Sequence, residues 1–221
     1  MPATPIRVLL ADDQENIRAA FRMILDAQPD IRVVGEAADG AAAADLARRL
    51  SPDVVLADIR MPRVDGLELT RRLLADPGSG DPPKVVVVTT FDLDEYVHAA
   101  LRDGASGFLI KRSGPALLVE AVRAAAAGDT LISPQITVRL LRELAASRPR
   151  PSGTGGEELT ERELDVVRAL ARGATNAEIA AELFLAAGTV KNHVAAIQRK
   201  TGARNRVGIA AWAWQHGVCR A

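Results

Sequence analysis

The sequence has little of several residue types that define common protein classes. It holds one cysteine, Cys219, among 221 residues, which excludes an internal disulfide framework and a cysteine-based zinc site. Its three histidines, His98, His193 and His216, are too far apart to predict a metal cluster from spacing. The longest apolar runs, such as residues 209–214, fall far short of the roughly 18 residues that a membrane-spanning helix needs. We therefore expect a cytoplasmic protein without a membrane partner.

Net charge is also absent, because 28 Lys+Arg balance 28 Asp+Glu, but the charges are unevenly distributed. Residues 1–138 hold 15 basic and 20 acidic side chains, so this part carries a net charge of −5. Residues 139–151 carry +3 and residues 152–221 carry +2. Between residues 183 and 221 there are six basic residues and no acidic one. The neutral total is therefore a cancellation between an acidic region and a region with a basic end.

The first half of the chain alternates between short apolar runs and helix-like stretches. Five runs rich in Val, Ile and Leu are typical of strands that are buried on both faces. Their alternation with helices predicts an α/β doubly wound five-stranded parallel sheet, which binds its ligand at the carboxyl ends of the strands. The predicted strands are 6–11, 31–37, 54–58, 84–89 and 107–110, and the predicted helices are 16–27, 41–50, 67–75, 95–102 and 115–127.

The pattern changes in the second half. A helix-like stretch begins at residue 133, and residues 147–156 (SRPRPSGTGG) form a Pro/Gly/Ser segment that indicates a flexible linker. Everything after it is helix-like, which predicts a small all-α domain. We therefore predict a first domain at 1–127, a linker with one helix at 128–158 and a second domain at 159–221.

Five polar residues stand where strands of the predicted sheet end. Asp12 and Asp13 follow the first strand, Asp58 ends the third, Thr89 ends the fourth and Lys111 follows the fifth. These ends share one edge of a parallel sheet, so the side chains are expected to converge. Carboxylates that converge repel one another, and Mg²⁺ is the natural counter-ion. One carboxylate could then accept a phosphoryl group whose oxygens the lysine and threonine neutralise. A single acidic residue at a strand end is often only a solvated loop residue, but the joint pattern favours a site.

Four segments of the first domain, in their order along the chain, resemble the receiver domain of two-component response regulators, which has a flavodoxin-like fold. The resemblance implies that Asp58 is the phospho-acceptor. It implies that Asp13 and Asp58 bind Mg²⁺ directly, together with the backbone carbonyl of Arg60, and that Asp12 acts through a water. The segments are VLLADD (8–13), VVLADIRMPRVDGLEL (54–69), VVVVTTFD (85–92) and GASGFLIK (104–111).

The same resemblance assigns the switch residues. Thr89 and Lys111 match the residues that contact the phosphoryl group, and Phe108 matches the aromatic residue that turns inward on activation. Phe91 stands where some relatives carry a polar residue that borders the path of the hydrolysing water. We therefore expect Phe91 to restrict water access and to lengthen the phosphoryl lifetime.

The predicted helices of the second domain are 160–172, 176–183, 189–200 and 207–217. Two of them begin with capping-box spacing, at Thr160 and Thr175. A short helix followed by a tight turn and a helix with basic and polar residues on its outer side is typical of a helix-turn-helix. The alternative from charge alone is a small helical bundle with a solvated basic face.

Residues 159–206 resemble the LuxR/FixJ/NarL-type helix-turn-helix domain, in which the helix that begins near Gly188 enters the major groove. Lys191 and Asn192 match positions that reach base edges, and Thr189 and His193 match backbone contacts. Independently of the resemblance, Arg199 and Lys200, like Arg204 and Arg206, are placed to contact phosphates. The final helix carries Trp212 and Trp214, and we expect one to close the core and the other to be partly exposed.

Together these features predict a response regulator transcription factor rather than an enzyme. A sensor histidine kinase would phosphorylate Asp58, and the phosphorylated homodimer would bind double-stranded promoter DNA, with RNA polymerase as a further partner that this class allows. One alternative is a regulator with an atypical receiver that needs no phosphorylation. Another is a haloacid-dehalogenase-like phosphatase, but such enzymes carry their nucleophile after the first strand in a DxD motif, whereas Asp12 and Asp13 are adjacent here.

Overall fold

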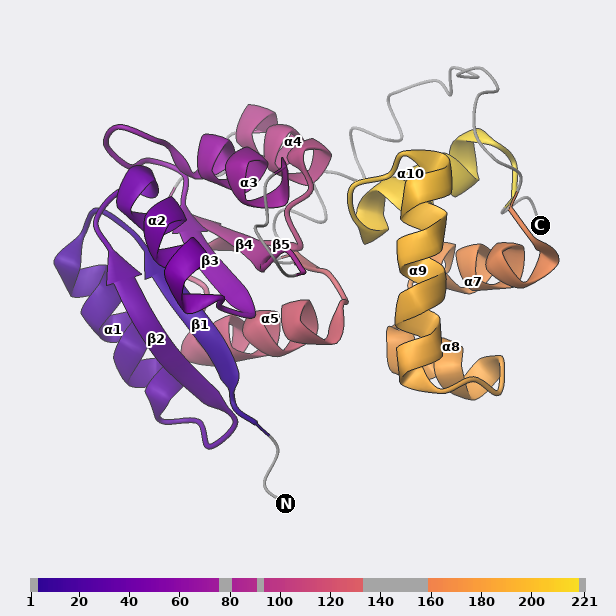
Figure 1. Ribbon diagram of the computed structural model, residues 1–221, viewed down its shortest axis with the longest axis horizontal. Helices are drawn as coiled ribbons and strands as arrows, with labels where there is room; N and C mark the ends of the chain where they lie inside the picture. Colours follow the sequence, from indigo (N-terminus) through magenta and orange to yellow (C-terminus); the bar gives the residue numbers. More distant parts are fainter. Residues whose placement is uncertain (1–3, 76–80, 91–93, 133–158, 219–221) are drawn as a thin grey trace. The chain divides into compact units, whose positions relative to one another are not determined.

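The chain divides into two units, which span residues 1–139 and 140–221. The computed structural model describes residues 4–75, 81–90, 94–132 and 159–218 (Figure 1). The helix predicted after residue 133 lies outside these described residues. Within them, no helix is both long and apolar enough to cross a membrane.

The first unit is built on a parallel sheet with the strand order β2-β1-β3-β4-β5-β6. All neighbouring strands pair in parallel, and the five predicted strands are confirmed. The strands are β1 (Ile6–Ala11), β2 (Ile31–Ala37), β3 (Val54–Asp58), β4 (Lys84–Thr89), β5 (Gly107–Ile110) and β6 (Leu131–Ile132).

The sixth strand was not expected, because the sequence predicts a five-stranded sheet. In β6, Leu131 pairs with Gly107 and Ile132 pairs with Phe108, so the segment covers the outer edge of β5. Gly107 permits this close approach, since a Cβ atom there would lie 2.9 Å from the carbonyl oxygen of Leu131. Two residues are too few to produce a periodic signal, and for this reason the sequence alone places them in the linker.

In the described part of the first unit, five helices cover the two faces of the sheet. Helices α1 and α5 contact each other on one face, while α2, α3 and α4 lie side by side on the other (Figure 1). Helix α2 begins at Gly40, since the Asp39 carboxylate accepts hydrogen bonds from the backbone N–H groups of Ala41 and Ala42. The helices are α1 (Glu15–Asp26), α2 (Gly40–Leu50), α3 (Gly66–Ala75), α4 (Asp94–Asp103) and α5 (Pro115–Ala127).

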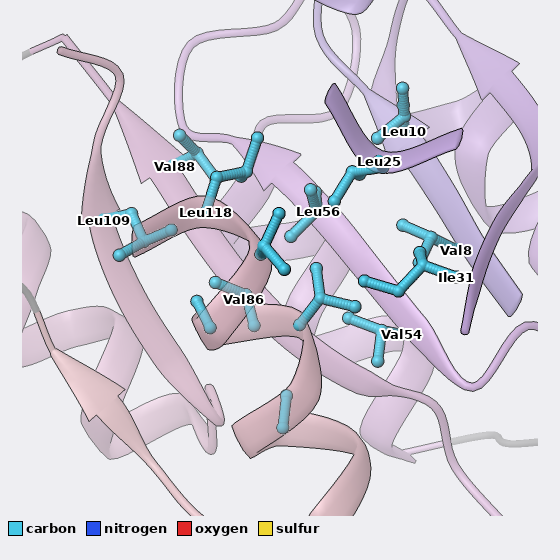
Figure 2. Packing of buried hydrophobic residues seen from close by; sticks show 14 of the residues in the cluster. Val8, Leu10, Leu25, Ile31, Val54, Leu56, Val86, Val88, Leu109 and Leu118 are labelled. Atoms are coloured by element: carbon cyan, nitrogen blue, oxygen red, sulfur yellow. The ribbon is translucent and has the colours of Figure 1, made fainter. Parts of the chain in front are cut away.

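Alternate residues of the strands form the main core between the sheet and helices α1 and α5. Val8, Leu56 and Val86 from three neighbouring strands pack with Leu25 of α1 and Leu118 of α5 (Figure 2). The residues between them in sequence point to the opposite face, because side chains alternate along a strand. Burial on both faces explains why the strands are continuous apolar runs. It also holds the strand ends, and therefore the acidic residues that follow them, in fixed positions.

Four helices make up the described part of the second unit. Thr160 and Thr175 each form a complete capping box, in which the threonine hydroxyl and a glutamate three residues later satisfy backbone N–H groups reciprocally. Trp212 packs against the core of this unit, whereas Trp214 is 66% exposed. The helices are α7 (Glu161–Ala171), α8 (Asn176–Glu182), α9 (Ala187–Thr201) and α10 (Arg206–Gln215).

Candidate functional site

Three carboxylates converge at the carboxyl edge of the sheet. Asp12 follows β1 and Asp58 ends β3, and both residues are buried, while Asp13 is exposed. Oxygen atoms of the three carboxylates lie within 4.8 Å of one another. The convergence that the strand ends predict is therefore present, with one carboxylate open to solvent and two inside.

The ammonium group of Lys111 lies between the two buried carboxylates. Its Nζ atom is 2.6 Å from Oδ2 of Asp12 and 2.8 Å from Oδ2 of Asp58. The three side chains are only 4–5% exposed. One buried cation thus faces two buried anions, so the pocket carries an uncompensated negative charge at its base.

Burial is the main cause that shifts the pKa of Asp58. It raises this pKa above the ordinary value of 3.8, and the charge of Asp12 adds to the effect, while the hydrogen bond and charge of Lys111 only partly offset it. Burial opposes the charged form of Lys111 as well, but the hydrogen bonds and charges of Asp12 and Asp58 outweigh burial and raise the pKa of Lys111. A further cation in this pocket would favour the ionised form of Asp58, which is the form that can act as a nucleophile.

The predicted switch residues come from the two adjacent strands β4 and β5. Thr89 ends β4 with 1% of its surface exposed, and its carbonyl accepts a hydrogen bond of 2.7 Å from the backbone N–H of Lys111. Phe108 in β5 is fully buried. Lys111 is therefore joined to Thr89 by a backbone hydrogen bond, and it directly follows β5, the strand that carries Phe108. Phe91 lies outside the described residues.

The loop between β3 and α3 packs directly against the backbone of Asp58. A Cβ atom on Gly66 would collide with the carbonyl oxygen of Asp58, and the backbone N–H of Gly66 donates a 3.0 Å hydrogen bond to the carbonyl of Ile59. Arg60, whose backbone carbonyl is a candidate metal ligand, lies inside this loop, and the backbone of Arg60 also hydrogen-bonds the Asp58 carboxylate. The glycine therefore fixes the loop next to the acidic pocket.

Arg18 also belongs to the site, although no sequence pattern marks it. Its guanidinium donates a 2.7 Å hydrogen bond to the backbone carbonyl of Asp12 and pairs with Glu36 of β2 at 3.3 Å. Arg18 lines the same hollow as Asp12 and Asp58. A helical arginine that holds a backbone carbonyl cannot be distinguished by sequence from any other charged residue on a helix surface.

In the second unit, one side of α9 is buried and the other carries polar and basic side chains. Val190, Val194 and Ile197 face the core. Lys191, Asn192 and Arg199 are exposed on the opposite side, and Thr189 and His193 are half-buried at its border. The helix thus presents an N-terminal polar surface of the kind that reads base edges in the major groove.

Lys200 and Arg206 differ from these residues in their surroundings. The ammonium of Lys200 is 2.8 Å from Oε2 of Glu163, a buried carboxylate in the first turn of α7. The guanidinium of Arg206 donates a 2.9 Å hydrogen bond to Oδ1 of Asn176 and a second one to the carbonyl of Ala174. Both cations thus contact the helical core, a feature that the sequence-based prediction of phosphate contacts did not include.

A sheet with an acidic pocket at its carboxyl edge, followed by a helix-turn-helix, defines a regulatory protein with a receiver and an effector. A family model described as a response regulator receiver domain matches residues 8–123. A second model, described as bacterial regulatory proteins of the luxR family, matches residues 157–213. The chain therefore belongs to the response regulators that join a receiver domain to a LuxR-type DNA-binding domain. This family comprises transcription regulators rather than enzymes.

Similarity to known proteins extends over nearly the whole chain. The chain is 39% identical over 218 residues to the uncharacterized transcriptional regulatory protein YxjL of Bacillus subtilis, covering 96% of this chain and 97% of that one. It is 39% identical over 211 residues to the transcriptional regulatory protein LiaR of the same organism, covering 94% and 96%. The crystal structure of ChrA, the response regulator of a heme-sensing two-component system, is 36% identical, covers 97% of this chain and 98% of its own, and has a TM-score of 0.53.

Proposed function

We propose that this response regulator is phosphorylated on Asp58 by a sensor histidine kinase in the cytoplasm. The observation that carries the proposal is the buried carboxylate of Asp58, 2.8 Å from Lys111, at the open edge of the sheet. An oxygen of Asp58 would attack the phosphorus of a phosphohistidine, the phosphorus–nitrogen bond would break, and the imidazole would leave. The ammonium of Lys111 already lies where it can neutralise an oxygen of the transferred group.

Mg²⁺ is the cofactor that fits this pocket. Receiver domains bind Mg²⁺ at an acidic pocket, and here hard oxygen ligands converge while the buried negative charge exceeds the positive charge. We assign Asp13, Asp58 and the backbone carbonyl of Arg60 as direct ligands and Asp12 as a ligand through a water. When bound, the ion neutralises charge on the acceptor and on the transferring phosphoryl group.

The signal would pass from Asp58 through Thr89 and Lys111 to Phe108. A phosphoryl group adds a charge of about −2 and new acceptor oxygens, which attract the threonine hydroxyl and the lysine ammonium. Thr89 and Lys111 are joined by a backbone hydrogen bond, so they would move together. Phe108 lies on the strand that leads to Lys111 and would then repack.

The second unit would bind double-stranded promoter DNA through α9, as a homodimer on two half-sites. Lys191 and Asn192 would reach base edges, while Thr189, His193 and Arg199 would contact the backbone. The exposed Trp214 face of α10 is available for pairing two DNA-bound copies, and RNA polymerase is a further partner. The sequence-based domain limits are 1–127 for the receiver, 128–158 for the linker and 159–221 for the DNA-binding domain, and β6, which pairs with β5, extends the sheet of the receiver to residue 132.

Treatment with a small phosphoryl donor and Mg²⁺ tests this function. The wild-type protein should gain the mass of one phosphoryl group and shift towards a dimer, whereas Asp58→Asn should do neither. If the two proteins behave alike in mass and oligomeric state, phosphorylation at Asp58 is refuted. DNA binding that is unchanged by the donor would instead favour a regulator that acts without phosphorylation.

Selection of bound genomic fragments by the phosphorylated protein would test the DNA-binding part. The expected result is a set of fragments with two related half-sites at a fixed spacing, because a symmetric dimer reads a repeated motif. Recovery of fragments without a shared motif would contradict specific operator binding.

A further inference from the structure

Lys200 stands in the last turn of α9, the helix that carries the proposed base-reading residues. Its ammonium is 2.8 Å from the carboxylate of Glu163, which lies 37 positions earlier in the sequence. The Glu163 side chain is 6% exposed and that of Lys200 is 20% exposed. The same carboxylate accepts hydrogen bonds from the backbone N–H of Thr160 at 2.7 Å and from the Thr160 hydroxyl at 3.0 Å. Lys200 therefore joins the end of α9 to the capping box that begins α7.

Removal of Lys200 from this carboxylate would be unfavourable. Burial alone would raise the pKa of Glu163, but the hydrogen bonds from Lys200 and Thr160 outweigh burial and hold the pKa below its ordinary value of 4.5. A buried carboxylate that has lost its cation carries a large desolvation penalty. Lys200 is thus stabilised at Glu163, whereas its neighbour Arg199 extends from the exposed side of α9.

Arg206 makes an equivalent connection between two other helices of the unit, α10 and α8. It opens α10, and its guanidinium bonds Oδ1 of Asn176, the buried first residue of α8, and the carbonyl of Ala174 just before α8. One cation therefore links α9 to the beginning of α7, and another links α10 to the beginning of α8. Together these links fix the helices that surround α9.

We propose that Lys200 and Arg206 are positioning residues rather than phosphate contacts. Lys200 sets the orientation of α9 against α7, and Arg206 sets that of α10 against α8, for DNA binding. The inference rests on the proposed DNA binding of the second unit. It assigns the phosphate-contacting role at the end of α9 to Arg199 alone of the adjacent pair. It also predicts that the two kinds of cation affect DNA binding in measurably different ways.

The salt dependence of DNA binding separates the two roles. The full-length protein is titrated onto a fluorescein-labelled duplex of mixed sequence, long enough for two half-sites, at several salt concentrations and well below the thermal midpoint of every variant. The matched variants are Arg199→Gln and Lys200→Gln. Loss of one phosphate contact reduces the slope of log affinity against log salt by about one. Arg199→Gln removes one such contact from each protomer, so we expect a reduction of about one for each protomer bound and about two for a dimer. Lys200→Gln should keep the wild-type slope but bind several-fold more weakly.

Two further variants keep the inference testable if Lys200→Gln folds poorly. Lys200→Arg keeps the charge near Glu163 and should restore the affinity. Glu163→Gln releases the ammonium without removing it, so a positioning role predicts weaker DNA binding, while a phosphate contact predicts equal or tighter binding.

Three results would contradict these expectations, each in a different way. A slope reduced in Lys200→Gln by about one for each protomer bound would make Lys200 a phosphate contact and overturn the inference. Unchanged slope and affinity with only a lower thermal midpoint would show a purely structural ion pair, which also overturns it. A wild-type protein that binds no duplex at any salt would refute the proposed DNA binding itself.

Discussion

Lys111→Met should destabilise the first unit strongly in the absence of Mg²⁺. The substitution keeps most of the apolar stem but removes the ammonium that bonds Asp12 at 2.6 Å and Asp58 at 2.8 Å. Two carboxylates that are only 4–5% exposed would then face each other without a cation. Removal of one partner from a buried ion pair costs about 3–5 kcal/mol. For a unit of this size the same loss lowers the thermal midpoint by roughly 10–20 °C.

The destabilisation of Lys111→Met should depend on pH and on Mg²⁺. Burial already raises the pKa of Asp58 with Lys111 in place, and without the lysine its ionised form becomes still less favourable. When the pKa of a carboxyl group is raised in the folded state, the folded protein loses stability as the pH rises through that pKa. The deficit should therefore be largest near neutral pH and should shrink in acid. Mg²⁺ should also reduce it, because the ion binds only the folded site.

Urea unfolding of the full-length protein provides the measurement. Both tryptophans lie in the second unit, so their fluorescence reports that unit, while circular dichroism follows both units and reveals the transition of the first. The control is the double variant Lys111→Met/Asp12→Asn, which leaves only one buried charge and should recover part of the loss. A single variant within about 1 kcal/mol of the wild type at neutral pH without Mg²⁺ would refute this electrostatic reasoning.

Three further predictions concern other parts of the chain. Gly66→Ala should lower the free energy of unfolding by about 1–3 kcal/mol and weaken Mg²⁺ binding, since its Cβ would push against the Asp58 carbonyl. Gly114→Ala is the control: its Cβ would have no atom within 4 Å, so in the same unfolding assay it should lower the free energy of unfolding by less than about 1 kcal/mol. The pKa of Glu163 is lowered in the folded state, so its contribution to stability is present above pH 4.5 and is lost as the pH falls below this value. Unfolding followed by tryptophan fluorescence should show this loss of stability in acid, and Glu163→Gln should reduce this dependence on pH. Trp214→Ala should change stability by under about 0.5 kcal/mol because the side chain is 66% exposed, but it should weaken binding to a duplex with two half-sites more than to one with a single half-site.

The sheet and the acidic pocket could be predicted from sequence because their determinants are local. The strands β1, β3, β4 and β5 are largely buried on both faces, so continuous apolar runs mark them, whereas the edge strand β2 is only partly buried. Because the strands run parallel, their carboxyl ends bring Asp12, Asp58 and Lys111 to one edge of the sheet. The observed helix ends differ from the predicted ones by at most two residues. Helix α2, for example, begins at Gly40 rather than at residue 41, because Asp39 caps it.

The features that the sequence did not predict depend on partners far apart in the chain. The capping box at Thr160 was visible, but Lys200 is 37 positions from Glu163 and nothing local marks the pair. The sequence predicts that one tryptophan closes the core and the other is partly exposed, but only the packing of the helices shows that Trp212 contacts the core while Trp214 is exposed.

The short strand β6 has a practical consequence for dividing the protein. A receiver that ends at residue 127 would lack Leu131 and Ile132 and would leave the edge of β5 without its partner. Gly107 offers no side chain to protect that edge, and an uncovered strand edge invites pairing with other molecules. A fragment that ends after residue 132 retains the covering strand. It should therefore remain monomeric at concentrations where the shorter fragment aggregates.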